Sequence, residues 1–119
     1  MDDAFLIAGY CHCSECQKFS GSQCSAWGRI ENEKVVVERG QELIQIYNKN
    51  ETGRVGFCKV CGSSLFNRQE AGAFINIRFG VLDDTPSVKP SVHVYFASRA
   101  PWHTEPASLP TYDTVPGVT

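Results

Sequence analysis

The sequence predicts a mainly β fold, built from irregular antiparallel sheets with cysteine-bearing loops and one short helical turn. Seven or eight short segments rich in β-branched or aromatic residues are separated at regular intervals by turn-forming residues, which indicates strands. Only residues 14–19, followed by Gly21, fit a helix. Many short strands with a single helical fragment are typical of an all-β domain.

Two of the predicted strands flank a pair of cysteines, and this places the pair at the tip of a hairpin. The flanking segments are residues 54–57 and 63–67. A Pro-containing tail, residues 103–119, shows little periodicity and is expected to wrap the surface or to stay partly mobile. The predicted strands, in chain order, cover residues 4–10, 24–30, 34–39, 43–47, 54–57, 63–67, 73–82 and 91–97.

Length and composition indicate one globular domain and exclude several classes of function. The chain has 119 residues, of which 42% are hydrophobic and 20% charged, with a formal net charge of −2. Nucleic-acid binding is disfavoured because the lysines and arginines are scattered singly. No apolar run approaches the roughly 18 residues that a membrane-spanning helix needs. Residues 1–5 are acidic where a signal peptide would be basic, so we expect a cytoplasmic protein.

The first cysteine motif predicts a zinc site. Cys11, Cys13 and Cys16 combine a Cys-x-Cys step with a Cys-x-x-Cys step, so a short helical turn lets three sulfurs converge. Soft thiolates in that arrangement select zinc over magnesium or calcium. Because catalytic zinc keeps three protein ligands and one open position, three close cysteines favour an open site. The alternative is a fourth ligand from elsewhere, which would close it.

The second motif, Cys58-x-x-Cys61 followed by Gly62, has the form of a zinc knuckle. It supplies two ligands and is therefore half of a structural site. Six cysteines in a secreted chain would indicate disulfides, but in a reducing compartment this clustered spacing favours metal binding.

Four stretches together resemble the glutathione-dependent formaldehyde-activating enzyme family, which also includes centromere protein V. They occur in the family's order and extend from about Gly9 to Trp102. The matching stretches are residues 11–21, 57–65, 80–84 and 98–102.

The resemblance implies a fold of irregular antiparallel sheets and up to two zinc ions. It assigns Cys11, Cys13 and Cys16 to the exchangeable, catalytic zinc, and Cys58 and Cys61 to half of a structural four-thiolate site. The family's other half is a Cys-x-Cys pair on an earlier strand, which this sequence does not contain. The chain is therefore expected to lack the family's first strand.

This departure leaves three alternatives for the knuckle. It is metal-free, or its zinc recruits Cys24, a histidine or a second chain, or one zinc joins the knuckle to two upstream thiols. A missing strand would also leave an open sheet edge, which favours a homodimer.

The function that the resemblance implies is a carbon–sulfur lyase of the S-(hydroxymethyl)glutathione synthase type. Its partners would be a small thiol such as glutathione and a small aldehyde such as formaldehyde, with zinc as cofactor. Two alternatives remain: a non-catalytic, zinc-stapled β domain that binds another protein, and a redox enzyme with Cys24 as its reactive cysteine.

The remaining candidates have ordinary structural explanations. His12, between two expected ligands, should point away from the metal, and His93 should be packed or exposed rather than catalytic. His103 and Arg78 are expected at the surface, and Cys24 is expected to be a small buried residue.

Overall fold

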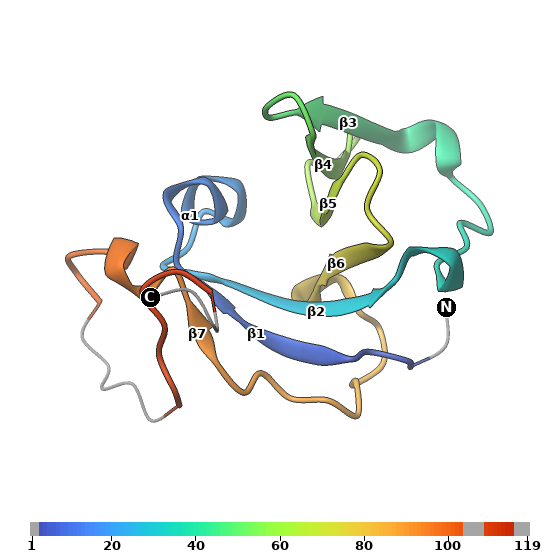
Figure 1. The fold of residues 1–119 in the computed structure, drawn as a ribbon. Helices are drawn as coiled ribbons and strands as arrows, with labels where there is room; N and C mark the ends of the chain where they lie inside the picture. The colour runs from blue at the N-terminus through green and yellow to red at the C-terminus, as the bar shows by residue number, and fades with distance from the viewer. Residues whose placement is uncertain (1–2, 104–108, 116–119) are drawn as a thin grey trace.

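The fold is mainly β, as the sequence predicts, and centres on one seven-stranded sheet (Figure 1). The computed structural model describes residues 3–103 and 109–115. The short helix α1 (Ser14–Ser20) follows the first strand. The strands are β1 (Ile7–Cys11), β2 (Ser25–Glu31), β3 (Ile44–Asn48), β4 (Gly53–Cys58), β5 (Ser64–Gln69), β6 (Phe74–Arg78) and β7 (His93–Val94).

The strands form one continuous mixed sheet rather than separate antiparallel sheets. Their order is β3-β4-β5-β6-β2-β1-β7, and every neighbouring pair is antiparallel except β1 and β7, which are parallel. A parallel pair needs a long connection, and the chain between β6 and β7 (residues 79–92) provides it. This connection returns the chain to the free side of β1, where the first cysteine motif begins.

Three predicted strands differ clearly from the observed ones. Of residues 73–82, only Phe74–Arg78 are in a strand, and a 3₁₀ turn (Phe79–Val81) follows. Residues 34–39 form no strand and pair with no strand of the sheet; a 3₁₀ turn (Asn32–Lys34) follows β2, and Val36 is 67% exposed. Strand propensity alone does not create a pairing partner. Of residues 91–97, only His93 and Val94 are in a strand, because Tyr95 adopts a left-handed conformation with φ of 53°.

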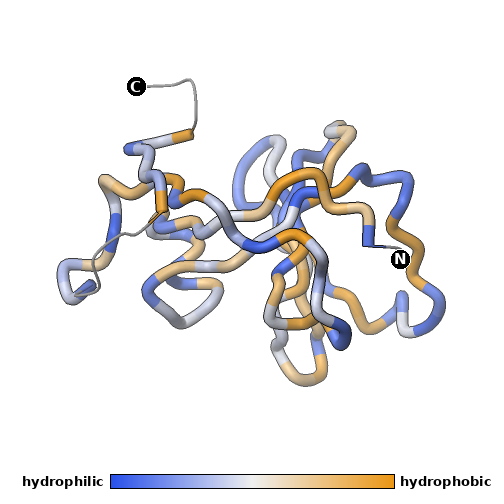
Figure 2. The backbone as a smooth tube through the Cα atoms, turned by 90° about the horizontal axis from the view of Figure 1, so that it is seen from below, coloured by the Kyte–Doolittle hydropathy of each residue, from blue (hydrophilic) through white to orange (hydrophobic). Residues whose placement is uncertain are grey.

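The hydrophobic core has two parts, which lie at opposite ends of the central strands. The first consists of buried residues of β2 and β6 with Phe5, whose ring meets that of Phe79 edge-on at 5.2 Å. The second consists of Cys11, Cys16 and two valines, so thiols replace aliphatic side chains there. Figure 2 shows hydrophobic stretches through the middle of the molecule, and others at its edge between hydrophilic segments.

The described part of the tail, residues 109–115, lies against the second part of the core. Thr111 forms a parallel bridge with His93, and the Tyr112 backbone exchanges hydrogen bonds with His93 and Phe96. The expectation for residues 104–108 and 116–119 falls outside the described residues. Among the described residues, no helix is long and apolar enough to cross a membrane.

Replacement of Gly28 by Ala should destabilise the protein by about 1–3 kcal/mol, because a Cβ there would overlap the Phe79 ring and lie 2.7 Å from Phe5. Gly80→Ala is the matched control, since a Cβ at Gly80 meets nothing within 4 Å; its effect should stay within about 0.5 kcal/mol. Urea unfolding of both variants measures the difference. Equal stabilities would show that the Gly28 contact has no energetic weight.

Candidate metal centre

The C-terminal end of β1 and the start of α1 bring three thiols together. Cys11 is the last residue of β1, between Ser25 of β2 and Val94 of β7. The chain then turns, and Cys13 caps α1: its Sγ accepts a hydrogen bond from the backbone N–H of Cys16 at 3.3 Å. Strand, turn and helix thus each contribute one sulfur.

The helix is fixed in place at both ends. Gly21 ends it in the left-handed conformation, with φ of 64°, and donates a backbone hydrogen bond to Gln17 at 2.8 Å. The side-chain amide of Gln17 donates to the carbonyls of His12 (2.7 Å) and Ser98 (2.9 Å). Gln17 therefore connects α1 to the residue that precedes the helix cap and to the segment that follows β7.

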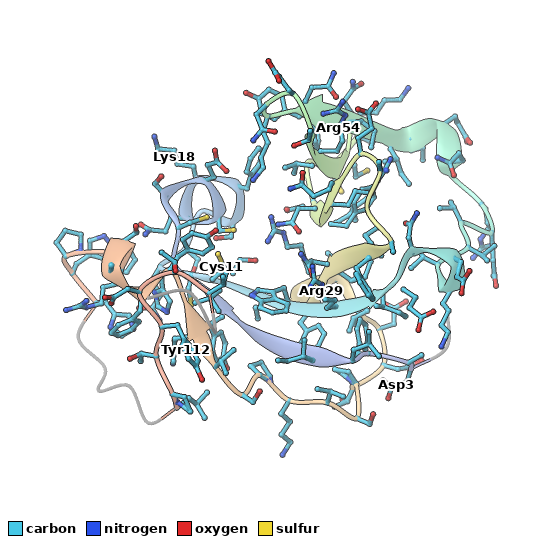
Figure 3. All side chains as sticks on the ribbon, viewed as in Figure 1. Asp3, Cys11, Lys18, Arg29, Arg54 and Tyr112 are labelled. Carbon is cyan, nitrogen blue, oxygen red and sulfur yellow. The ribbon has the colours of Figure 1, made fainter. Side chains whose placement is uncertain are left out.

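The geometry of the three thiols fits a tetrahedral thiophilic metal. Their sulfur atoms all lie within 4.8 Å of one another. Zn–S bonds of about 2.3 Å in a tetrahedron separate two sulfurs by about 3.8 Å, so small shifts would bring all three onto one ion. Figure 3 shows sulfur atoms gathered between α1 and β2, beside the labelled Cys11. As the sequence predicts, the three thiols converge, and together they could hold a metal ion.

The negative charge of the cluster is concentrated on one sulfur. Hydrogen bonds from the Cys11 and Cys16 thiols, aided by the Cys16 backbone N–H and the Lys49 charge, lower the pKa of Cys13. Hydrogen bonding to Cys13 and Cys16, together with burial, raises the pKa of Cys11. These shifts favour the thiolate form at the half-buried Cys13 over Cys11.

The cluster opens into a cavity with a volume of about 840 Å³. All three cysteines line it, and Trp27 forms part of its wall. Three cationic side chains from β2, β5 and the β3–β4 turn also line it: Arg29, Arg68 and Lys49. This positive lining suits an anionic ligand that reaches the sulfur cluster.

An ion pair joins α1 to the β3–β4 turn at this cavity. Lys49 Nζ lies 2.8 Å from a carboxylate oxygen of Glu15. Burial opposes the charged form of Lys49, but the Glu15 carboxylate and the charges of Cys13 and Cys16 raise its pKa on balance. Lys49 is therefore a positive charge near the thiols, partly neutralised by Glu15.

Arg78 is the site residue that the sequence analysis assigned wrongly. It was expected at the surface, yet it is 5% exposed and contacts the cluster. Its Nη1 donates to Ser25 Oγ at 2.8 Å and lies 3.8 Å from Cys16 Sγ, and its Nε donates to Ser64 Oγ at 3.3 Å. Its position as the last residue of β6, paired with Trp27, could not be inferred from local spacing.

The three histidines gather near the cluster. His12 is fully buried, and its Nε2 shares a 2.8 Å hydrogen bond with His93 Nδ1. The His103 ring lies 5.4 Å from that of His12, and Phe96 packs edge-on against His12. His12 thus points into an aromatic cluster, and the half-buried His103 belongs to it rather than to the open surface expected for it.

The second motif does not join the first. Cys58 ends β4 and Cys61 follows in the exposed hairpin turn, as the sequence predicts. Gly62, with φ of 80°, donates its backbone N–H to the Cys58 carbonyl at 2.7 Å. Hydrogen bonds from Ser63 and from the Cys58 thiol lower the pKa of Cys61.

Within residues 3–103 and 109–115, the only group of three or more possible ligands is the Cys11–Cys13–Cys16 cluster. This contradicts a single zinc shared between the knuckle and the upstream thiols. It also leaves the knuckle without a third ligand from the described part of the chain. Cys24, expected to be buried, is half-buried and lies outside the cluster.

Comparisons with known proteins bear on the family and the fold. A family model described as "Glutathione-dependent formaldehyde-activating enzyme" matches residues 2–98. No curated protein sequence matches the chain. A crystal structure of a Rhodobacter sphaeroides protein is similar, with a TM-score of 0.57 and 19% sequence identity over 69% of this chain and 73% of the other. At that identity the likeness concerns the fold alone.

Protonation of His12 should make the stability of the metal-free, reduced protein depend on pH. Burial, then the charges of His93, His103 and Arg99, lower the pKa of His12 from 6.5 to about 4. Between these values the unfolded chain binds the proton more readily, so stability is full above pH 6.5 and is lost as the pH falls towards 4, by up to about 3 kcal/mol. Urea unfolding against pH should show this slope in the native sequence and a weaker one in His12→Gln. The same slope in both proteins would contradict the assignment.

Proposed function

The chain belongs to the glutathione-dependent formaldehyde-activating enzyme family, and from this premise we propose that it is a zinc-dependent carbon–sulfur lyase. In the synthetic direction it would add a small thiol, such as glutathione, to formaldehyde or a related small aldehyde. The observation that carries this proposal is the convergence of Cys11, Cys13 and Cys16 at the wall of a large cavity. Three ligands beside an open space are what a metal needs to accept a substrate.

The three cysteines would hold the zinc ion. When bound, zinc would supply a Lewis acid that lowers the pKa of an incoming thiol at neutral pH. The sulfur of that thiol forms a bond to the aldehyde carbon, and the thiol proton ends on the aldehyde oxygen. The product is an S-hydroxymethyl adduct, and the reaction needs neither oxidant nor reductant.

The chain's own residues would bind and orient the two reactants. Arg29, Arg68 and Lys49 line the cavity that leads to the thiols, so they would attract the carboxylates of a peptide-like thiol such as glutathione. Figure 3 shows Arg29 on β2, on the same sheet as the labelled Cys11. Holding both reactants in one cavity converts a bimolecular encounter into a local one, and we assign much of the rate enhancement to this effect.

A non-catalytic zinc staple is the second candidate. It is favoured by the composition of the second part of the core, where Cys11 and Cys16 take the place of aliphatic residues. A metal there would tie β1 to α1 and stabilise a small domain. The cationic cavity beside the thiols favours the enzyme, because a staple has no use for an open, charged approach.

We assign Cys58 and Cys61 to a second zinc site, completed by the same pair of a second copy. The half-buried Cys58 and the exposed Cys61 flank a turn that a backbone hydrogen bond already shapes, and two such pairs supply the four thiolates of a closed structural site. Cys58 is paired with Ile44 of β3, a terminal strand of the sheet, so the knuckle is accessible to another chain. We also propose a cytoplasmic location, where the six free cysteines would stay reduced.

Glutathione should enter the coordination sphere of the first site. With cobalt in place of zinc, titration with glutathione should change the visible spectrum, because the open position gains a sulfur ligand. Cys13→Ser should abolish cobalt binding at this site, whereas Cys24→Ser, outside the cluster, should keep both the spectrum and its response. A cobalt spectrum that saturating glutathione leaves unchanged would exclude the enzyme and favour the staple.

The second site should appear as a zinc-dependent dimer. Elemental analysis should give about 1.5 zinc per chain, one at the first cluster and half of a shared ion, and light scattering should show twice the monomer mass. Cys58→Ser should lower zinc to about one per chain and restore the monomer mass, while Cys24→Ser should do neither. About two zinc per chain at monomer mass would refute sharing between copies.

A further inference from the structure

Arg78 carries a buried positive charge that no carboxylate neutralises. It is 5% exposed at the end of β6, and among the described residues it forms no ion pair with an aspartate or glutamate. Its polar contacts are the hydroxyls of Ser25 and Ser64 and the sulfur of Cys16. Its second amino group, Nη2, is buried without a hydrogen-bond partner in the described part of the chain.

A buried guanidinium without a counter-charge lowers the stability of the fold unless an anion lies nearby. Burial of a charge without a counter-charge costs several kcal/mol, and arginine cannot escape the cost by losing its proton. Hydroxyl groups satisfy donors but carry no charge. A group that can be anionic, the sulfur cluster, is in contact with Arg78, whose Nη1 lies 3.8 Å from Cys16 Sγ.

The position of Arg78 separates it from the cationic side chains of the cavity. Arg29, Arg68 and Lys49 line the cavity, whereas Arg78 does not. Lys49 is already paired with Glu15 at 2.8 Å, and Arg29 is exposed and lies over the Phe74 ring at 4.8 Å. Arg78 alone contacts the cluster from within the sheet, so it acts on the thiolates and not on a ligand in the cavity.

Arg78 is also attached to the strand that holds the cluster. Ser25, which accepts its shortest hydrogen bond, is the residue that pairs with Cys11 across β1 and β2. Arg78 therefore contacts the surroundings of Cys11 through Ser25 and contacts Cys16 directly. The planar guanidinium can contact Ser25 and Cys16 at the same time because its donors are fixed relative to one another.

We propose that Arg78 is a positioning residue that supplies the counter-charge for the metal-loaded sulfur cluster. The proposal rests on the proposed function only in that Cys11, Cys13 and Cys16 hold zinc. A divalent ion with three thiolates has a single net negative charge, and the buried Arg78 offsets it from within the sheet, on the side away from the cavity. The incoming thiol would then meet a neutral site rather than a negative one, which restores Lewis acidity that three thiolates would otherwise remove.

The test compares zinc binding in Arg78→Met, Arg78→Lys and Arg39→Met. Arg39 is exposed, so its variant makes the same charge change away from the site. Chelator competition should show zinc affinity at the first site reduced about 10- to 100-fold in Arg78→Met, as for other residues that support metal ligands. Arg78→Lys should recover most of the loss, because lysine keeps the charge, and Arg39→Met should bind zinc as the native sequence does.

Thermal unfolding with and without zinc distinguishes a counter-charge from a packing role. Removal of a buried charge that no carboxylate pairs should leave the metal-free Arg78→Met at least as stable as the native sequence. Zinc should then raise its melting temperature less than it raises that of the native protein.

Several outcomes would overturn the proposal. Unchanged zinc affinity in Arg78→Met would do so, as would equal loss of stability with and without zinc, or an Arg78→Lys variant no better than Arg78→Met. If Arg78→Met does not fold, Arg78→Lys still decides, since a zinc affinity reduced as far as 100-fold in it would refute a role for charge. Failure of the native protein to bind zinc would instead refute the proposed function, and tight zinc binding without turnover would refute the enzyme while leaving the role of Arg78 intact.

Discussion

The strand pairing on both sides of Cys11 is the constraint on which the rest of the site depends. Ser25 on β2 and Val94 on β7 fix the end of β1, and from this fixed end the chain turns directly into α1. Because the turn is short, it holds Cys13 and Cys16 close to Cys11. The parallel partner β7 matters as much as the antiparallel one, because it brings the aromatic and histidine cluster against the same turn.

The electrostatics of the site follow from where its charges are buried. The sulfur cluster concentrates its negative charge on Cys13, Arg78 opposes it from within the sheet, and Lys49 opposes it from the cavity. Buried charges interact more strongly than exposed ones because less water screens them. The Lys49–Glu15 pair, half exposed, contributes less and serves mainly to connect α1 with the β3–β4 turn.

The sequence predicts what depends on neighbours along the chain and fails where distant segments meet. The spacing of Cys11, Cys13 and Cys16 predicts that their sulfurs converge. Local sequence likewise predicts the end of α1 at Gly21 and the hairpin that carries the second cysteine pair. Arg78 comes to Cys16 from 62 positions away, through the order of strands in the sheet. In an alternating strand pattern an arginine is usually on the solvated face, and only the neighbouring strands decide otherwise. The strand predicted over residues 34–39 is wrong for the same reason, since a β-branched composition does not tell whether a partner strand lies beside the segment.

The two cysteine motifs differ in a way that separates their roles. The first is enclosed by β1, β2, α1 and Arg78 on one side and open to a cationic cavity on the other, so a bound ion would be supported by protein and accessible to a ligand. The second lies at the tip of a hairpin, with Cys61 exposed and hydrogen-bonded to Ser63, and neither of its cysteines lines that cavity. Its backbone forms the tight turn of a zinc knuckle, yet it provides only half of the ligands that a closed site needs. A site that a substrate can reach through a cavity is suited to catalysis, so we place the reaction at the first motif. A half site on the surface is suited to sharing a metal with another chain, so we place the contact between copies at the second motif.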